Sequence, residues 1–337
     1  MTVRIAGAGL AGLVAATTAA RAGESVEVFE AKRDLLPSTG AHTEALRNYE
    51  AMDAVEELRA YGFRLRPFAE VQTAIRKSAH YENVLHGKSY YLFMRGRQPY
   101  TVDQQLFNEA TDLGVEFHFG TLAPSRVDIV ATGPPRGTFN MLAAGFTFSA
   151  NGSNLDPNTV VALLDNTVAP GGYLAITPGL EYHSIYSGSW TDLEYERVLA
   201  TAKRGFELPW VREILGSSRW VGKIHGTAYY SPDPIATSVR DGARYVGEAG
   251  GFQDAVAAYG FRYAVITGAL SAQSVVEGTD YTSLLWKAFG GEFTGAYQYR
   301  KKLDHATNED FDNLVKALGP ELTLEEYRQL RGHLRAL

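Results

Sequence analysis

The first thirty residues restrict the fold more than any other stretch of the chain. An apolar run over residues 2–6 is followed by the pattern G-x-G-x-x-G over residues 7–12, an alanine-rich run to residue 22 and a second apolar run over residues 25–30. A strand, a glycine turn, a helix and a second strand in this order form the βαβ unit in which the glycine pattern holds a dinucleotide. The sequence therefore predicts a Rossmann-like binding site here.

Each glycine of the pattern has its own expected role. Gly7 permits the tight turn, Gly9 lets the backbone approach a pyrophosphate, and Gly12 lets helix and sheet pack closely. The start of the following helix offers free N–H groups to the phosphates. Glu30 lies where a ribose hydroxyl needs an acceptor, and an acid there disfavours a 2′-phosphate, so NADP(H) is not expected in this site. The unit predicts cofactor contacts at Gly7, Ala8, Gly9, Ala11, Gly12, Glu30, Ala31 and Lys32.

The composition excludes several classes of protein. The net charge is −6 and no basic block exists, so nucleic acid is not an expected partner. The absence of cysteine excludes disulfides, thiolate catalysis and cysteine-ligated metals, and the histidines show no metal-ligand spacing, so no metal site is expected. A start without a secretory signal, and no apolar run of about 18 residues, predict a cytoplasmic protein, with contact at a membrane surface left open.

The pattern of elements changes twice beyond residue 30. Helices expected over residues 45–61 and 101–110 alternate with strands expected over residues 68–75, 89–94, 115–119 and 127–133, which favours a parallel sheet. Short strands between residues 134 and 237, separated by Gly, Pro and Asn, indicate an antiparallel sheet with one helix near residues 192–205. A strand, a glycine turn and a long helix over residues 255–276 follow, and a helical tail over residues 281–337 is expected to pack outside the core.

A second glycine turn favours FAD over NAD. Gly247, Glu248 and Gly251 follow a predicted strand far along the chain from the first turn. A nicotinamide dehydrogenase has no use for another such turn, whereas an extended FAD spans the sheet and needs a second contact. We expect Glu248 to hydrogen-bond the ribityl or pyrophosphate end, and the helix after Gly251 to direct its positive end at the pyrimidine edge of the flavin.

The predicted fold class is therefore α/β, with a Rossmann-like FAD-binding domain, an inserted antiparallel-sheet substrate domain and a C-terminal helical segment. The expected boundaries are residues 1–62, 95–133 and 238–275 for the FAD-binding domain, residues 63–94 and 134–237 for the sheet domain, and residues 276–337 for the helical region.

These stretches resemble the geranylgeranyl reductase family, flavoproteins of the para-hydroxybenzoate-hydroxylase-type fold. Residues 244–272 resemble the family stretch GDAAG…GxGI…A…G…A, and residues 169–179 (APGGYLAITPG) resemble its stretch PGGYGWxFP. Arg97 with the run VDQQL resembles the arginine and helix that touch FAD, and the helical tail over residues 286–318 is similar. The resemblance and the second turn imply cofactor contacts at Thr43, Arg97, Gly133, Gly247, Glu248, Gly251, Tyr259, Gly260 and Phe261.

The chain also departs from the family pattern. Glu248 replaces the usual aspartate, Ala255 replaces a proline, and the cysteine motif of some members is absent near residues 38–41. The Asp-Gly element of aromatic hydroxylases is missing after residues 131–133, which disfavours an NADPH-driven monooxygenase. The tryptophan-bearing signature of flavin halogenases is also missing.

The resemblance implies an FAD-dependent oxidoreductase that reduces isolated C=C bonds of a polyprenyl or other apolar substrate, with a hydride from the flavin and a proton from a positioned acid. The candidate catalytic residues are His42, Tyr173 and Tyr259, and each has ordinary packing as its alternative role. The electron donor would be NAD(P)H or a reduced carrier protein. Two alternatives stay open: an FAD monooxygenase acting on a small aromatic substrate, and a flavin-binding electron-transfer or scaffold protein without turnover.

Overall fold

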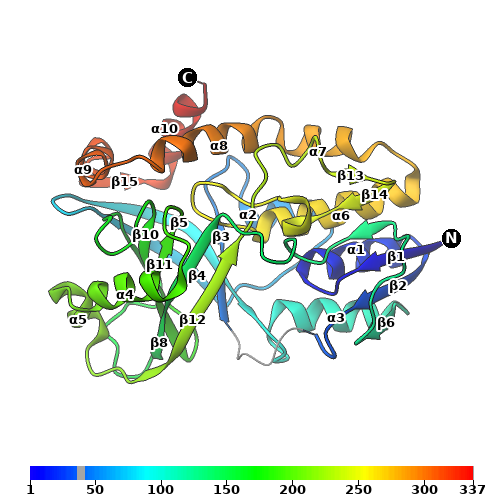
Figure 1. Ribbon diagram of the computed structural model, residues 1–337, viewed down its shortest axis with the longest axis horizontal. Coiled ribbons are helices and arrows are strands. Elements are labelled where there is room, and N and C mark those ends of the chain that lie inside the picture. The colour runs from blue at the N-terminus through cyan, green and yellow to red at the C-terminus, as the bar shows by residue number, and fades with distance from the viewer. Residues whose placement is uncertain (36–41, 337) are drawn as a thin grey trace.

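Two sheets make up most of the protein and lie next to each other along its long axis (Figure 1). The computed structural model describes residues 1–35 and 42–336, with side chains up to residue 331. The smaller sheet has the order β13-β14-β7-β1-β2-β6, and its neighbours are parallel except for the hairpin β13–β14. Its strands are β1 Thr2–Ala6, β2 Ser25–Glu30, β6 Glu116–Phe119, β7 Ile129–Val130, β13 Val239–Arg240 and β14 Ala243–Tyr245.

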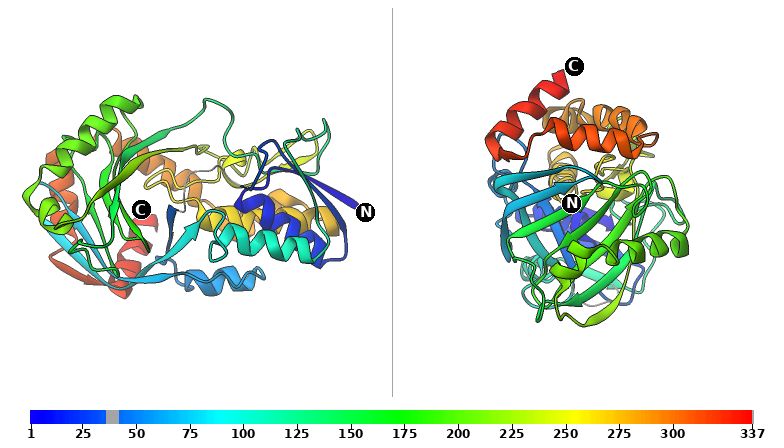
Figure 2. Two further views of the ribbon diagram at one scale, coloured as in Figure 1. Left: turned by 90° about the horizontal axis from the view of Figure 1, so that it is seen from below. Right: turned by 90° about the vertical axis from the view of Figure 1, so that its left-hand side faces the viewer.

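Three helices pack together beside the smaller sheet (Figure 2). They are α1 Leu10–Arg21, α3 Val102–Asp112 and α6 Phe261–Glu277. Helix α1 has small side chains, so its neighbours pack closely around it. It is buried over most of its length and forms the centre of this layer. A Cβ atom added at Gly268 of α6 would lie 2.5 Å from the carbonyl oxygen of Ala11, so α1 and α6 touch backbone to backbone.

The larger sheet has nine strands in the order β12-β8-β11-β10-β9-β4-β5-β15, with β3 also pairing on β5. Its pairs are antiparallel except for β4–β9 and β5–β15. Helices α4 Tyr195–Phe206 and α5 Pro209–Leu215 cover one face of this sheet. The strands are β3 His42–Arg47, β4 Ala69–Lys77, β5 Glu82–Arg95, β8 Met141–Ser149, β9 Thr159–Leu163, β10 Tyr173–Thr177, β11 Tyr182–Ser189, β12 Trp220–Ala228 and β15 Glu321–Thr323.

The prediction of a helix over residues 45–61 is wrong for the first part of this range. Residues 42–47 form β3, which pairs with the second half of β5, and the helix is only α2 Ala54–Ala60. Asp53 caps α2 by accepting hydrogen bonds from the backbone N–H groups of Val55 and Glu56, so the helix begins where its cap is available. Pairing with β5 therefore overrides the helix-forming composition of Ala45 and Leu46. The domain boundaries stay a prediction, and β3 hydrogen-bonds within the larger sheet.

The strand predicted over residues 89–94 is longer than expected. Strand β5 begins at Glu82, well before residue 89, where the predicted strand begins. Its outer edge is shared, because Val84 to His86 pair with β15 while Tyr90 to Arg95 pair with β3.

The C-terminal helices take part in the core, contrary to the prediction that they pack outside it. Phe289 and Phe293 pack with Phe252 and Tyr263 in one aromatic cluster. The buried Arg300 donates a hydrogen bond to the carbonyl of residue 171 at 2.7 Å. The tail consists of α7 Tyr281–Phe289, α8 Glu292–Leu303, α9 Asn308–Ala317 and α10 Leu324–Ala336, with β15 before α10. Among the residues that the structure describes, no helix is long and apolar enough to cross a membrane.

Candidate functional site

The first glycine turn gives its three glycines different surroundings. Gly7 has a φ angle of +101°, and a Cβ atom there would collide with the carbonyl of Ala131. A Cβ atom on Gly12 would collide with the carbonyl of Gly7, so Gly12 allows α1 to close against the turn. A Cβ atom on Gly9 would meet no other atom within 4 Å. The space beside Gly9 is therefore open to a ligand.

The carboxylate of Glu30 lies beside the same turn. Its Oε2 atom accepts a hydrogen bond from the N–H of Ala8, and its Oε1 atom accepts one from the N–H of Lys32, both at 2.9 Å. The N-cap residue of α1, Gly9, supplies no side-chain hydrogen bond to the helix. The start of α1 therefore keeps backbone N–H groups and the positive end of its dipole for an anion.

The second glycine turn adjoins the first. Strand β14 leads into a short 3₁₀ helix, η1 Gly247–Gly250, and the φ angle of Gly247 is +52°. A Cβ atom on Gly247 would lie 3.1 Å from the Cβ atom of Ala11 in α1. Gly133 follows β7, the strand between β14 and β1, with a φ angle of +75° and open space at its Cβ position. Loops at the carboxyl ends of three neighbouring strands thus meet, which is where open α/β sheets bind ligands.

Glu248 is a partly buried acid in the second turn. Its Oε1 atom accepts a hydrogen bond from the N–H of Tyr229 at 2.7 Å. Burial, with a smaller contribution from the charge of Glu44, raises the pKa of Glu248 to about 7. A carboxyl with this pKa holds a proton near neutral pH and can donate a hydrogen bond to a ligand oxygen.

Arg95 is a largely enclosed arginine, and the sequence pattern pointed instead to Arg97. The Nε and Nη2 atoms of Arg95 donate to the two oxygens of Asp103 at 2.7 Å, and its Nη1 atom pairs with Glu44. Arg97 instead forms an ion pair with Asp34 near the surface. Asp103 is fully buried in the first turn of α3, and a buried acid requires a cation beside it. That requirement is the signal that could have identified Arg95.

His42 begins β3 and lies directly across from Arg95 in the register of β3 and β5. The residue keeps contact with solvent, yet the protein packed around the imidazole, and then the charge of Arg95, lower the pKa of His42. Thr43 lies against the turn between β10 and β11, because a Cβ atom on Gly179 would be 2.9 Å from its Oγ1 atom. Residues 36–41, which precede His42 and include the place of the family's cysteine motif, fall outside the described residues.

Tyr173 and Tyr259 lie in a second group, away from His42. The O–H of Tyr173 donates to the carbonyl of Ala257 at 2.7 Å, and the Arg47 guanidinium lies 5.1 Å from the centre of the Tyr259 ring. Burial raises the pKa of both phenols well above the ordinary value. Arg47 is the sixth residue of β3 and His42 the first, a separation of about 16 Å along a strand. The three predicted acids are therefore not brought together.

A ten-residue loop separates the second glycine turn from α6. The sequence predicts a helix soon after Gly251, but α6 begins at Phe261, with Gly260 as its N-cap residue. Gly251 has a φ angle of +77°, and a Cβ atom there would lie 2.6 Å from the Cβ atom of Ser231. The Phe261 ring stacks on Phe93 of β5 with ring centres 4.6 Å apart. The start of α6 is thus fixed to the larger sheet as well as to the smaller one.

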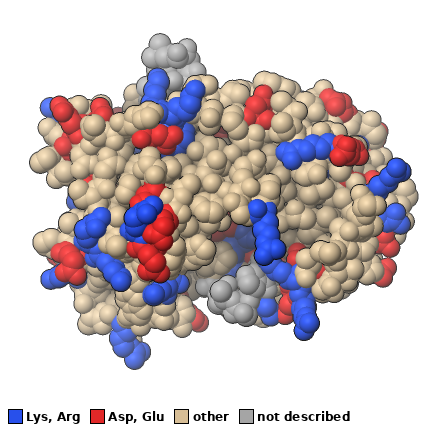
Figure 3. All heavy atoms as spheres, in the orientation of Figure 1, with Lys and Arg blue, Asp and Glu red and all other residues tan. Residues whose placement is uncertain are grey.

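The surface is hollowed between the two sheets (Figure 3). On the larger sheet, Thr147, Ser184 and Thr177 are neighbours in register on the face opposite to α4 and α5. All three are partly exposed, so this face presents a row of hydroxyl groups.

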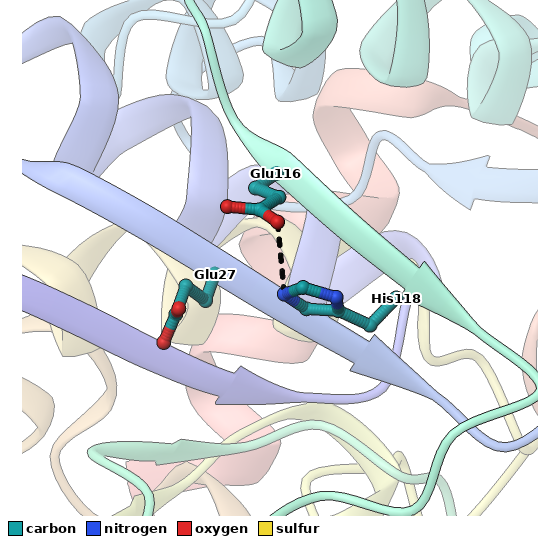
Figure 4. Close-up of side chains that lie close together, drawn as sticks. All are labelled: Glu27, Glu116 and His118. Atoms are coloured by element: carbon teal, nitrogen blue, oxygen red, sulfur yellow. Dashed lines mark ion pairs between the residues drawn. The ribbon is translucent and has the colours of Figure 1, made fainter.

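A separate polar cluster lies on the outer edge of the smaller sheet (Figure 4). Atoms of Glu27, Glu116 and His118 that could bind a metal lie within 4.8 Å of one another. The Nε atom of Arg4 lies 2.9 Å from Glu27, and the His118 ring stacks on Phe29 with centres 4.7 Å apart. The Nε2 atom of His118 lies 3.6 Å from Oε1 of Glu116, the pair drawn as a dashed line in Figure 4.

Two glycine turns that meet at the carboxyl ends of parallel strands are the arrangement of a Rossmann-like fold. A family model described as an NAD(P)-binding Rossmann-like domain matches residues 5–59. The comparison with curated proteins found no match.

Solved structures share the fold over nearly the whole chain. A geranylgeranyl bacteriochlorophyll reductase-like protein from Thermoplasma acidophilum is 17% identical, with a TM-score of 0.77, and the match covers 96% of this chain and 93% of that protein. A flavoprotein/dehydrogenase from Cytophaga hutchinsonii is 16% identical, with a TM-score of 0.67, covering 99% and 93%. A flavin-dependent brominase is 17% identical, with a TM-score of 0.65, covering 95% and 94%. The predicted resemblance in fold is confirmed, because the chain has the α/β fold of these flavoproteins, with a second sheet and C-terminal helices.

Proposed function

We propose that the protein is an FAD-dependent oxidoreductase. The observation that carries this proposal is the meeting of the two glycine turns. The open space beside Gly9 lies at the start of α1, and Gly247 packs against Ala11 in the first turn of the same helix. A dinucleotide extended across the carboxyl ends of β1, β7 and β14 would contact both turns.

The residues at the two turns fit the separate parts of FAD. The start of α1 offers N–H groups to the pyrophosphate, and Glu30 offers a carboxylate to a ribose hydroxyl. At the second turn, Glu248 offers a carboxyl group that can donate or accept a hydrogen bond at about pH 7. The extra methylene of Glu248, compared with the aspartate of the family, extends its reach toward a ribityl hydroxyl.

We infer that the reaction is the reduction of C=C bonds in a polyprenyl or other apolar substrate. FAD, when bound, supplies the two-electron chemistry of such a reaction. The reduction of a C=C bond also needs a proton, and a side chain of the protein has to release it. The lowered pKa of His42 makes its imidazole a proton acceptor at pH 7, and the raised pKa of Tyr173 and of Tyr259 makes both phenols weak acids. Glu248, with a pKa of about 7, carries a releasable proton near neutral pH, but its proposed place is at the ribityl chain of the cofactor.

A smaller and more polar substrate is the second candidate. Thr147, Ser184 and Thr177 present hydroxyl groups on the same face of the sheet as Tyr173 and Tyr186. A hydrocarbon chain cannot form hydrogen bonds with such a row, whereas an aromatic substrate with polar substituents would hydrogen-bond to it. Both candidates need an electron donor, either NAD(P)H or a reduced carrier protein. We place the reaction in the cytoplasm, and at a membrane surface if the substrate is a polyprenyl lipid.

Purification followed by mass spectrometry of the extracted small molecules tests the proposal. FAD together with an isoprenoid would support the reduction of an apolar substrate. FAD without a lipid, and NADPH oxidation that increases when a phenol is added, would support the second candidate. A protein that neither contains flavin nor binds added FAD would overturn both.

A substitution at Gly9 tests where the pyrophosphate binds. Gly9→Val should abolish retention of FAD, because the new side chain would fill the open space at the start of α1. Gly295→Val is a matched control, since the Cβ position of Gly295 in α8 is also open. A Gly9→Val protein that stays yellow would show that the pyrophosphate lies elsewhere.

A further inference from the structure

The loop over residues 251–260 contains an unusual backbone conformation. Ala258 has a φ angle of +57°, a region that residues with side chains rarely adopt. The other described non-glycine residue with a positive φ angle, Asp241, belongs to the tight turn of the hairpin β13–β14, where such angles are common. Ala258 has no hairpin to explain it, so its conformation has to be imposed by contacts around the loop.

Hydrogen bonds within the loop and from one distant strand hold it. The N–H of Ala258 donates to the carbonyl of Asp254 at 2.9 Å, and the Ala258 carbonyl accepts from the Nε2 atom of Gln253 at 2.9 Å. The carbonyl of Ala257 accepts from the phenol of Tyr173 in β10 at 2.7 Å. The residues on both sides of Ala258 are therefore tied to fixed partners.

One ion pair connects the loop to β3. Arg47 pairs with Asp254, whose other carboxylate oxygen accepts from the N–H of Val256 at 2.8 Å. The side chains of Arg47 and Asp254 are only 17% and 4% exposed. The Arg47 guanidinium also lies 5.1 Å from the centre of the Tyr259 ring and 5.9 Å from that of Tyr49. A buried charge pair in contact with the ring of a loop residue fixes both the loop and that ring.

We propose that Arg47 and Asp254 are positioning residues for the cofactor. The pair holds the loop over residues 251–260 in its strained form and thereby fixes Tyr259 and the start of α6, which would face the flavin when FAD is bound. This inference rests on the proposed function. It adds a role for β3, which begins with the predicted site residues His42 and Thr43 and ends at Arg47.

The test uses the full chain with FAD as the probe. Asp254→Asn keeps the shape of the side chain and removes its charge, and Arg47→Met removes the guanidinium. Asp192→Asn is the control, because Asp192 pairs with the exposed Arg197. We expect both loop variants to raise the dissociation constant for FAD at least about tenfold and to change the shape of the visible absorption bands of the bound flavin. The control should match the wild type in both measurements.

A rescue experiment separates positioning from general stability. Glycine adopts positive φ angles without strain, so adding Ala258→Gly to Arg47→Met should restore the absorption bands and part of the affinity. The same double variant keeps the test informative if Asp254→Asn does not fold. Single variants that lose thermal stability but bind FAD with wild-type affinity and bands would overturn the inference and leave the proposed function intact. A wild-type protein that binds no FAD would overturn both.

Discussion

The two glycine turns of the candidate site are built in opposite ways. The first is mostly local, because its strand, its glycines and α1 follow one another directly and Gly12 packs on Gly7, although Ala131 also contacts the turn. The second depends on distant residues. Gly247 donates to Thr267, and the loop after Gly251 is held by Arg47 from β3 and Tyr173 from β10. A turn fixed by neighbouring residues can be identified from a short sequence pattern, whereas a turn fixed from elsewhere cannot.

Among the tests of this difference between the two turns, removal of the buried ion pair should have the largest effect on stability. Asp254→Ala leaves the Arg47 guanidinium buried without its partner, and we expect a loss of about 3–5 kcal/mol in the free energy of unfolding. Urea unfolding measures the loss. Asp192→Ala, which breaks an exposed ion pair with Arg197, should cost less than about 1 kcal/mol. Equal losses in the two variants would show that the second turn does not depend on β3.

A substitution in the first turn should lower the stability nearly as much, but for a steric reason. Gly12→Ala introduces a Cβ atom that collides with the carbonyl of Gly7, and we expect a loss of about 3 kcal/mol in the free energy of unfolding. Thermal unfolding of the variant, compared with Gly295→Ala in α8, measures it. A Gly12→Ala protein as stable as the control would mean that α1 can move away from the turn at little cost.

The acid of the second turn should make stability depend on pH. The pKa of Glu248 is raised from 4.5 to about 7 in the folded protein, so its contribution to stability is fully present below about pH 4.5 and is lost as the pH rises to about 7. Between about pH 5 and pH 8, the cofactor-free wild type should lose on the order of 2 kcal/mol relative to Glu248→Gln. Urea unfolding of both proteins across this range provides the comparison, and parallel curves would contradict the raised pKa.

The smallest effect on stability is expected at Gly9. Gly9→Ala places a methyl group in open space at the N-cap of α1, where alanine is less favourable than glycine, so the free energy of unfolding should fall by less than about 1 kcal/mol. Differential scanning calorimetry of the cofactor-free protein measures this change. A large loss would show that the space beside Gly9 is needed by the protein itself, which would remove the main support for a ligand there.

The sequence was sufficient for the parts of the fold that depend on local patterns. The strand, glycine turn and helix over residues 2–22, and most strands of the larger sheet, follow from periodicity and turn residues. Strand β3 could not be predicted, because Ala45 and Leu46 favour a helix and only pairing with β5 makes them a strand.

The candidate site shows the same division. The glycines of both turns and Glu248 are recognisable from spacing, whereas Arg95, Arg47 and Asp254 matter through contacts with residues that are distant in sequence. Aromatic residues of the tail join the core for a similar reason, since the partners of Phe289 and Phe293 lie in the loop before α6 and in α6 itself. No periodicity within the tail indicates those partners.

The shared outer edge of β5 has a consequence for the synthesis of the chain. Residues 84–86 form their ladder with residues 321–323, which are synthesised after all the other strands of that sheet. Until then, the backbone groups on that side of the strand have no partner, and an open strand edge is a template for association between nascent chains. Truncation of the gene before β15 should therefore produce insoluble protein, even though both glycine turns would be complete.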